Sequence, residues 1–301
     1  MLCLTGDLSD LKRKGYGGEE KFDGTCLVII KKKDSITLQN RDGIIYTRRI
    51  PEAVESARRI PGTFTLHTEA VYINPRTGQT EFTPCQRRCA TEDLVKQIHL
   101  QQIERIYPLT CKAHDILEFD GKDLKTWPYT ERKALLQRLL SKVKTTIEYV
   151  PYRTDLGPFF EEVKQQEGEG IVAKRLDSPY QEMPDQNRRS WDWLKIKNWR
   201  YEEFNVAGFT EGKNSRKWFF GALIVTDDQG RYRGKVGGGF SDVQLRLIKD
   251  ILTDAPRVAR PFTLDESYTA VKTKLRIRAR YYKITENGVM RFPEFEDIIS
   301  S

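Results

Sequence analysis

The stretch Glu19-Glu20-Lys21-Phe22-Asp23-Gly24 stands immediately before the β-branched and apolar run Thr25–Lys33. That run has the composition of a β-strand, so the six residues before it are expected to form a charged turn that enters the strand. A K-x-D-G tetrapeptide is by itself equally compatible with an ordinary turn. Its significance depends on the segments that follow it along the chain.

Five further segments follow in order, each with charged residues beside apolar ones. They are Asn40-Arg41-Asp42-Gly43, Leu66–Val71 around Glu69, His114–Leu117 leading into Asp120–Leu124, Glu167–Arg175 around Glu169, and Trp193–Lys197. Lys195 and Lys197 are two residues apart, which places both on one face of a strand. Taken singly, each of these charges is compatible with a solvated surface, and only their order makes a site.

The length and the composition limit the number of domains and indicate an ordered chain. The 301 residues allow about two domains, and 11% aromatic residues argue against disorder. The first part predicts strands over 25–33, 62–72, 112–119, 170–174 and 193–197, a hairpin over 35–47, helices over 51–60, 92–106, 130–143 and 156–166, and a surface arm or short helix within 1–18. After Trp199 we predict strands over 205–209, 220–226, 231–236 and 275–284 and one helix over 242–252. The predicted class is α+β, with domains 1–199 and 200–301, the second a small antiparallel β-barrel.

The remaining global features favour an intracellular protein with an anionic partner. Lys and Arg number 51 against 43 Asp and Glu, a net charge of +8. Five cysteines without paired spacing suit a reducing compartment. No apolar run approaches the roughly 20 residues that span a bilayer, and no secretory signal is recognisable, so we expect no membrane partner.

The ordered segments resemble the covalent nucleotidyltransferase superfamily, which comprises ATP-dependent DNA ligases, RNA ligases and capping guanylyltransferases. Within it the chain is most similar to the ligase module of ligase D, of the non-homologous end-joining type. The similarity covers nearly the whole chain, including 204–212 and 234–241. It implies a nucleotidyltransferase (adenylation) domain with antiparallel sheets and flanking helices, followed by an OB-fold barrel.

The resemblance also implies a set of site residues. Lys21 would attack the α-phosphate of ATP and carry AMP covalently, with Lys195 and Lys197 as further catalytic residues, and Mg²⁺ or Mn²⁺ would lie at Glu69 and Glu169. The implied nucleotide-binding residues are Glu19, Glu20, Arg41, Glu69, His114 and Lys174. Because only a neutral amine is nucleophilic, we expect Lys174, Lys195, Lys197 and the metal to lower the pKa of Lys21.

The chain departs from the family pattern at three places. Cys26 stands where an arginine is usual, and His114 stands where an aromatic residue stacks on adenine. The segment 291–297 takes the place of a basic C-terminal motif that helps to orient pyrophosphate. Two alternatives therefore stay open: an RNA ligase or capping-type enzyme, and a catalytically impaired relative that only binds nucleic acid.

A second nucleic-acid signal comes from the residues alone. In 272–280 every even position is Lys or Arg, whereas Leu275, Ile277 and Ala279 are apolar. This period of two predicts a strand with one cationic face, and because like charges repel we expect an anionic partner there. The alternative is an edge strand protected by charge. The predicted DNA-binding residues are Arg41, Arg276, Arg278, Arg280 and Lys235.

The expected function is ATP-dependent sealing of 5′-phosphate/3′-hydroxyl breaks in DNA, in repair or end joining. The expected partner is nicked or broken double-stranded DNA, clamped without an N-terminal helical DNA-binding domain. By resemblance, an end-binding Ku-like protein and a repair polymerase are further expected partners. We expect a monomer at the nucleoid of a prokaryotic cytoplasm.

Overall fold

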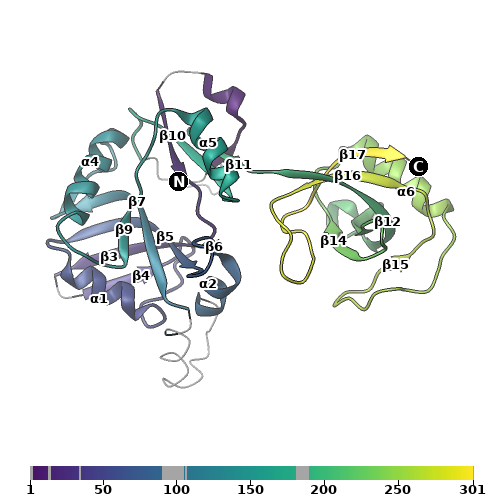
Figure 1. The fold of residues 1–301 in the computed structure, drawn as a ribbon, viewed down its shortest axis with the longest axis horizontal. Helices are drawn as coiled ribbons and strands as arrows, with labels where there is room; N and C mark the ends of the chain where they lie inside the picture. Colours follow the sequence, from purple (N-terminus) through teal and green to yellow (C-terminus); the bar gives the residue numbers. More distant parts are fainter. Residues whose placement is uncertain are drawn as a thin grey trace. The chain divides into compact units, whose positions relative to one another are not determined.

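The computed structural model describes residues 3–12, 15–33, 35–89, 105, 107–180 and 190–300. The chain divides into two compact units, Met1–Asn198 and Trp199–Ser301 (Figure 1). The helix predicted over 92–106 lies almost entirely outside the described residues. No described helix has the length and apolar character needed to cross a membrane.

The larger sheet of the first unit has seven strands. They are β3 (Thr25–Lys32), β4 (Ser35–Gln39), β5 (Phe64–Ile73), β6 (Thr80–Glu81), β7 (Leu109–Phe119), β8 (Lys122–Asp123) and β9 (Ile147–Tyr149). The order is β4-β3-β5-β7-β8, β6 pairs with β5, and β9 pairs parallel with β7. The helices α1 (Pro51–Arg59), α2 (Phe82–Cys89) and α4 (Tyr129–Leu140) contribute to one core with this sheet.

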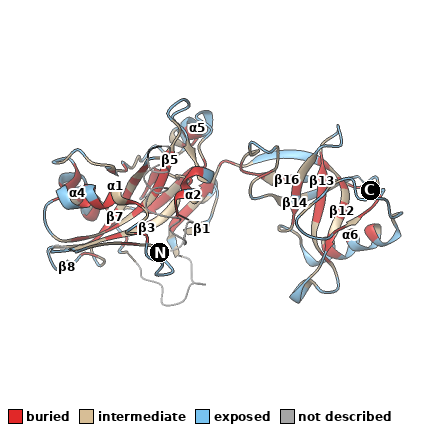
Figure 2. Cartoon of the chain, turned by 90° about the horizontal axis from the view of Figure 1, so that it is seen from below, coloured by how far each residue is buried: buried red, intermediate tan, exposed pale blue. Residues whose placement is uncertain are grey.

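Strand alternation divides this sheet into an apolar and a polar face. Leu27, Leu66 and Ala113 are fully buried in the core that the sheet shares with the helices. Figure 2 colours the buried residues of the chain red. Because successive side chains of a strand point to opposite faces, their neighbours Cys26, His67 and His114 point away from the helices. That second face is therefore free to carry chemistry.

A second, four-stranded sheet completes the first unit. It has the order β1-β11-β10-β2, with strands β1 (Cys3–Thr5), β11 (Ser190–Lys197), β10 (Gly170–Arg175) and β2 (Tyr16–Glu20). The short helix η1 (Leu8–Lys12) and the helix α5 (Leu156–Gln165) supply apolar side chains that pack on one face of it. The opposite face carries Glu19, Val172 and Lys195, which lie side by side in register.

Strand β2 corrects the prediction of a surface arm within 1–18. Tyr16–Glu19 are buried and pair with β10. The two glycines hide the strand from a pattern search because they contribute no side chain. At Gly18 a Cβ atom would lie 2.8 Å from Leu156 Cδ2, so the bare backbone is what lets α5 pack closely.

The second unit is built on one six-stranded sheet. Its strands are β12 (Arg200–Glu211), β13 (Phe220–Thr226), β14 (Tyr232–Val236), β15 (Thr269–Ala270), β16 (Arg276–Tyr281) and β17 (Glu294–Ser300), and its helices are η2 (Asn214–Arg216) and α6 (Asp242–Asp254). The order is β14-β13-β12-β16-β17, and β15 also pairs with β12. Between the two edges a single bridge, Gly238–Glu294, is formed, so the described strands do not form a closed barrel.

Most predicted strands and helices within the described residues are confirmed, and the errors are local. The hairpin predicted over 35–47 is formed only in part. Its first arm is β4, whereas its second arm makes a single bridge, Gln39–Ile45. Helix α2 was not predicted, since Thr83-Pro84 has the composition of a turn. Strand β17 was not predicted because its sequence is too acidic to show a clear alternation. Helix α6 begins at a capping box between Ser241 and Gln244.

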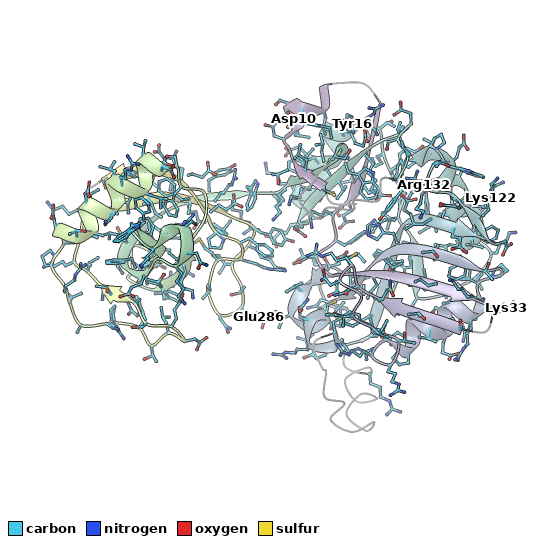
Figure 3. All side chains as sticks on the ribbon, turned by 180° about the vertical axis from the view of Figure 1, so that it is seen from behind. Asp10, Tyr16, Lys33, Lys122, Arg132 and Glu286 are labelled. Carbon is cyan, nitrogen blue, oxygen red and sulfur yellow. The ribbon has the colours of Figure 1, made fainter. Side chains whose placement is uncertain are left out.

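A buried ion pair joins α4 to the larger sheet. Arg132, labelled in Figure 3, donates from Nε and Nη2 to the two carboxylate oxygens of Asp115 on β7, at 2.8 and 2.9 Å. Both side chains are fully buried. The pair fixes the rotation of α4, and therefore the position of the residue that follows Arg132.

Replacing Arg132 by Leu should destabilise the first unit by about 3–5 kcal/mol, because Asp115 would remain as a buried, uncompensated charge. Urea unfolding of the whole chain measures this. Arg153→Leu is the matched control, since the Arg153–Asp155 pair is exposed and its loss should change little. Equal effects of the two changes would contradict a special role for the buried pair.

Candidate active site

The polar faces of the two sheets of the first unit meet. The His67 ring of β5 is stacked on Trp193 of β11, with ring centroids 6.2 Å apart and planes at 11°. His114 of β7 contacts Glu19 of β2. Most of the residues predicted to bind the nucleotide or to catalyse therefore come from two different sheets and lie on the sheet faces opposite the two apolar cores.

Lys21 directly follows β2. Its backbone N–H donates to the Gly170 carbonyl at 2.9 Å, which continues the pairing of β2 with β10. Its Nζ donates to Glu169 Oε2 at 2.8 Å. The Lys21 side chain is 24% exposed, whereas that of Glu169 is 4% exposed. An amine within reach of a substrate is thus held by a buried carboxylate.

The prediction that neighbouring lysines lower the pKa of Lys21 is wrong. Burial pulls the pKa of Lys21 down, but the carboxylates of Glu169, Glu69 and Asp23 outweigh burial and leave this pKa above its ordinary value. The Lys174 amine instead donates to Glu19. The groups that dominate at Lys21 are thus carboxylates rather than the predicted lysines.

Glu69 lies on β5 opposite Cys26 in register. Burial raises the pKa of Glu69 to about 8. The nearby charges of Glu169 and Asp23 also raise this pKa, whereas Lys21 lowers it. A carboxyl group with this pKa is largely protonated at neutral pH. A divalent cation beside it would favour its charged form.

Glu69 and Glu169 are the predicted metal ligands, and the question is whether they supply enough ligands for a metal ion. Among the described residues no group of three or more His, Cys, Asp or Glu side chains could hold a metal ion. Mg²⁺ is often held by one or two carboxylates, with waters and substrate phosphates completing its coordination. The two glutamates fit that open type of site and do not form an all-protein cage.

Glu19 is the most heavily bonded carboxylate of the site. It is fully buried, and Oε1 accepts from Tyr129 Oη at 2.6 Å and from Lys133 Nζ at 2.7 Å. Its Oε2 accepts from Lys174 Nζ and lies 3.2 Å from His114 Nδ1. Despite burial, the two lysines hold the pKa of Glu19 well below its usual range. The carboxylate thus joins β2, β7, β10 and α4.

Sequence reasoning missed Lys133 and Tyr129. Both are buried and lie on the face of α4 that also carries Leu136 and Leu140. A lysine at an apolar position of a helical pattern was the available signal, because lysine is almost never fully buried unless it is paired. The pairing itself depends on β2, which was predicted as an arm.

His114 is oriented by Glu19 and lies near Phe22, with ring centroids 6.1 Å apart. Burial and the nearby lysines lower the pKa of His114, although Glu19 opposes this effect.

Cys26 is another residue that departs from the family pattern. Its Sγ lies 3.3 Å from His67 Nε2. Burial and Glu69 raise the pKa of the Cys26 thiol to about 12, so the group is a neutral thiol at ordinary pH.

The remaining predicted residues surround this cluster. Arg41 follows β4 and is 67% exposed, with Nε 3.9 Å from Asp42 Oδ2. Lys197 lies opposite Gly170 in register and Lys195 opposite Val172, so both flank the strand that begins beside Glu169. Glu20 alternates away from Glu19, and burial raises its pKa.

The cationic strand of the second unit has the predicted alternation but not the predicted imbalance of charge. Ile277 and Ala279 are buried, and the arginines occupy the other face. Each arginine is paired with carboxylates from neighbouring segments. The pairs are Arg276 with Glu203 and Asp228, Arg278 with Glu203, and Arg280 with Glu294 and Glu296. Lys235 is likewise paired with Glu266. The expectation that repulsion within the strand demands an external anion is therefore wrong.

Comparison with known proteins identifies the family and the fold of the chain. The fold matches the solved structure of a mycobacterial DNA ligase D complexed with ATP, with a TM-score of 0.57 and 25% identity over 99% of this chain and 93% of that one. The first unit is therefore a nucleotidyltransferase-type ligase domain. The model of the ATP dependent DNA ligase domain matches residues 6–197, and the chain belongs to that family.

Two curated relatives show how far the similarity extends. A probable DNA ligase of Dictyoglomus thermophilum is 30% identical over 262 residues, which cover 81% of this chain and 43% of the relative. The multifunctional non-homologous end joining protein LigD of Mycolicibacterium smegmatis is 27% identical over 309 residues, which cover 99% of this chain and 38% of the relative. The chain thus spans less than half the length of these two relatives.

The raised pKa of Glu69 predicts a loss of stability at alkaline pH. A carboxyl group whose pKa rises on folding stabilises the protein fully below its unfolded pKa, and this contribution is lost as pH rises through about 8. Between pH 6 and 9 the Tm of the wild type should therefore fall more steeply than that of Glu69→Gln, which cannot ionise. At pH 9 Mg²⁺ should raise the Tm of the wild type more than that of the variant. If the Tm of the two proteins fell in parallel with pH, Glu69 would not be a carboxyl group with a raised pKa.

Proposed function

We propose that this chain is an ATP-dependent DNA ligase module that seals 5′-phosphate/3′-hydroxyl breaks through AMP bound covalently to Lys21. The observation that carries the proposal is the partly exposed Lys21 amine held at 2.8 Å by the buried Glu169 carboxylate. Membership of the ATP-dependent DNA ligase domain family supports it. So does the similarity to a ligase D structure that contains ATP.

The chemistry can be written with this chain's own residues. The Lys21 amine attacks the α-phosphorus of ATP, so an N–P bond forms and the bond to pyrophosphate breaks. Glu169 already accepts a hydrogen bond from this amine and is placed to take the proton that the nitrogen must lose. AMP then passes to the DNA 5′-phosphate, and attack by the 3′-hydroxyl on that phosphate releases AMP.

The carboxylates around Lys21 are best explained by a cationic partner that arrives with the nucleotide. Glu69 and Glu169 would hold Mg²⁺ or Mn²⁺, which when bound neutralises phosphate charge. Lys195 and Lys197 would add positive charge beside Glu169. Glu19 orients Lys174 and His114 toward the nucleotide, and Arg41 would contact its ribose and later the DNA 5′-phosphate.

The second unit would supply the DNA-binding module. We infer an OB-type fold from its sheet of short strands, whose edges are joined by the Gly238–Glu294 bridge. End joining is the favoured context, because similarity to the end-joining protein LigD covers 99% of this chain. A Ku-like end-binding protein and a repair polymerase are the partners this context implies.

Incubation with α-³²P-ATP and Mg²⁺ tests the proposal. The wild type should show a labelled band on a denaturing gel, and both Lys21→Ala and Lys21→Arg should lose it. Arginine is the sharper control, because it keeps the charge partner of Glu169 but cannot form the phosphoramidate. A fully labelled Lys21→Arg variant would sink the assignment, and labelling by GTP alone would favour a capping-type enzyme.

If the β16 arginines also face DNA, removing their internal partner should strengthen binding. Glu203→Gln frees Arg278 and leaves Arg276 paired with Asp228, and it should steepen the dependence of log K on log salt by about 0.9 for each additional phosphate that the strand then binds. Asp155→Asn in the first unit changes net charge equally and is the control. Identical slopes for the two variants would remove the strand from the DNA-binding surface.

A further inference from the structure

The connection between β12 and β13 presents a tryptophan to solvent. Trp218 is 72% exposed, although the next two residues, Phe219 and Phe220, pack in the core of the second unit. A large apolar side chain that stays in water beside two packed aromatics suggests an interaction surface.

The loop that carries Trp218 is held in one conformation. Arg216 donates from Nη1 to the carbonyls of Gly221, at 3.2 Å, and Gly237. At Gly212 a Cβ atom would lie 1.8 Å from the Arg216 carbonyl oxygen, so the turn can close only over a glycine. Phe219 N–H donates to that same carbonyl at 2.8 Å. The exposure of Trp218 is therefore built into the fold.

The charges beside Trp218 are positive and unbalanced. Lys213 and Lys217 are exposed, and within the described part of the chain neither has a carboxylate at ion-pair distance. Lys217 Nζ lies 5.6 Å from the centroid of the Trp218 ring. The β16 arginines differ in this respect, since each is paired internally.

We propose that Lys213, Lys217 and Trp218 form a DNA-contacting loop, in which the lysines bind phosphates and the indole packs on a base or sugar. Lysines bind the phosphates of any nucleic acid, and an aromatic side chain flanked by cations is the arrangement with which proteins bind single strands without reading their sequence. Tryptophan is enriched in protein interfaces but lysine is depleted there, so the two lysines are what favour DNA over a protein partner. The proposal rests on the proposed function, and it names the part of the second unit that grips the substrate.

The lysines and the tryptophan should have separable effects on a 5′-phosphorylated nicked duplex. Trp218→Ala should weaken binding about tenfold with an unchanged salt slope, because stacking releases no counterions. Trp218→Phe should restore most of the affinity. The double variant Lys213→Gln/Lys217→Gln should make the slope of log K against log salt shallower by about 1.8, because each of the two lost phosphate contacts contributes about 0.9. Arg231→Gln is the control, since this exposed arginine is already paired with Asp227.

Two readouts distinguish the failure of this inference from the failure of the proposed function. If the wild type takes no label from ATP, the proposed function fails. If it labels and seals normally while the loop variants bind the duplex as tightly as the wild type, with the same slope, the loop inference is overturned. DNA should also protect tryptophan fluorescence from acrylamide quenching in the wild type and less so in Trp218→Phe. Equal protection in both would likewise overturn it.

Discussion

The geometry of the candidate site depends on one buried carboxylate. Glu19 lies in a region without solvent, where a negative charge is costly unless hydrogen bonds and opposite charges compensate for it. Tyr129, Lys133, Lys174 and His114 do so from α4, β10 and β7. These elements cannot shift independently without leaving a buried charge unpaired. Because Lys21 follows Glu19 by two residues, directly after β2, the network that holds Glu19 also holds Lys21 in place.

The charge around Lys21 fits a site that is completed by its substrate. Glu169, Glu69 and Asp23 together raise the pKa of Lys21, which would oppose the action as a nucleophile that we propose for it. The same carboxylates would be balanced by a divalent cation carried in with a nucleotide triphosphate. The carboxylate pattern therefore favours the protonated lysine until the cation arrives. In the proposed reaction a neutral Lys21 amine is needed only when the α-phosphate is in place.

The parts of the fold and of the site that could be predicted are those that depend on a pattern within one short segment of the sequence. Glu69, Glu169 and Lys197 adjoin strands whose alternation is legible in the sequence, and they come together with Lys21 in the structure. Strand β2 was missed because its glycines carry no pattern. The carboxylates opposite Arg276 and Arg278 were also missed, because Glu203 and Asp228 are distant in sequence and meet them only through strand pairing. Local patterns assign faces, but they do not assign the partners across a sheet.

That distinction changes how the second unit is expected to bind DNA. A row of arginines in the sequence indicates a strong electrostatic surface, yet carboxylates that already neutralise it reduce the number of counterions that DNA binding can release. Unpaired lysines on a short loop contribute more per charge, because no internal ion pair must break. The Arg216 hydrogen bonds fix that loop before any ligand arrives, so little conformational entropy is lost on binding. Affinity in this unit should therefore follow unpaired charge and preorganisation rather than the number of basic residues.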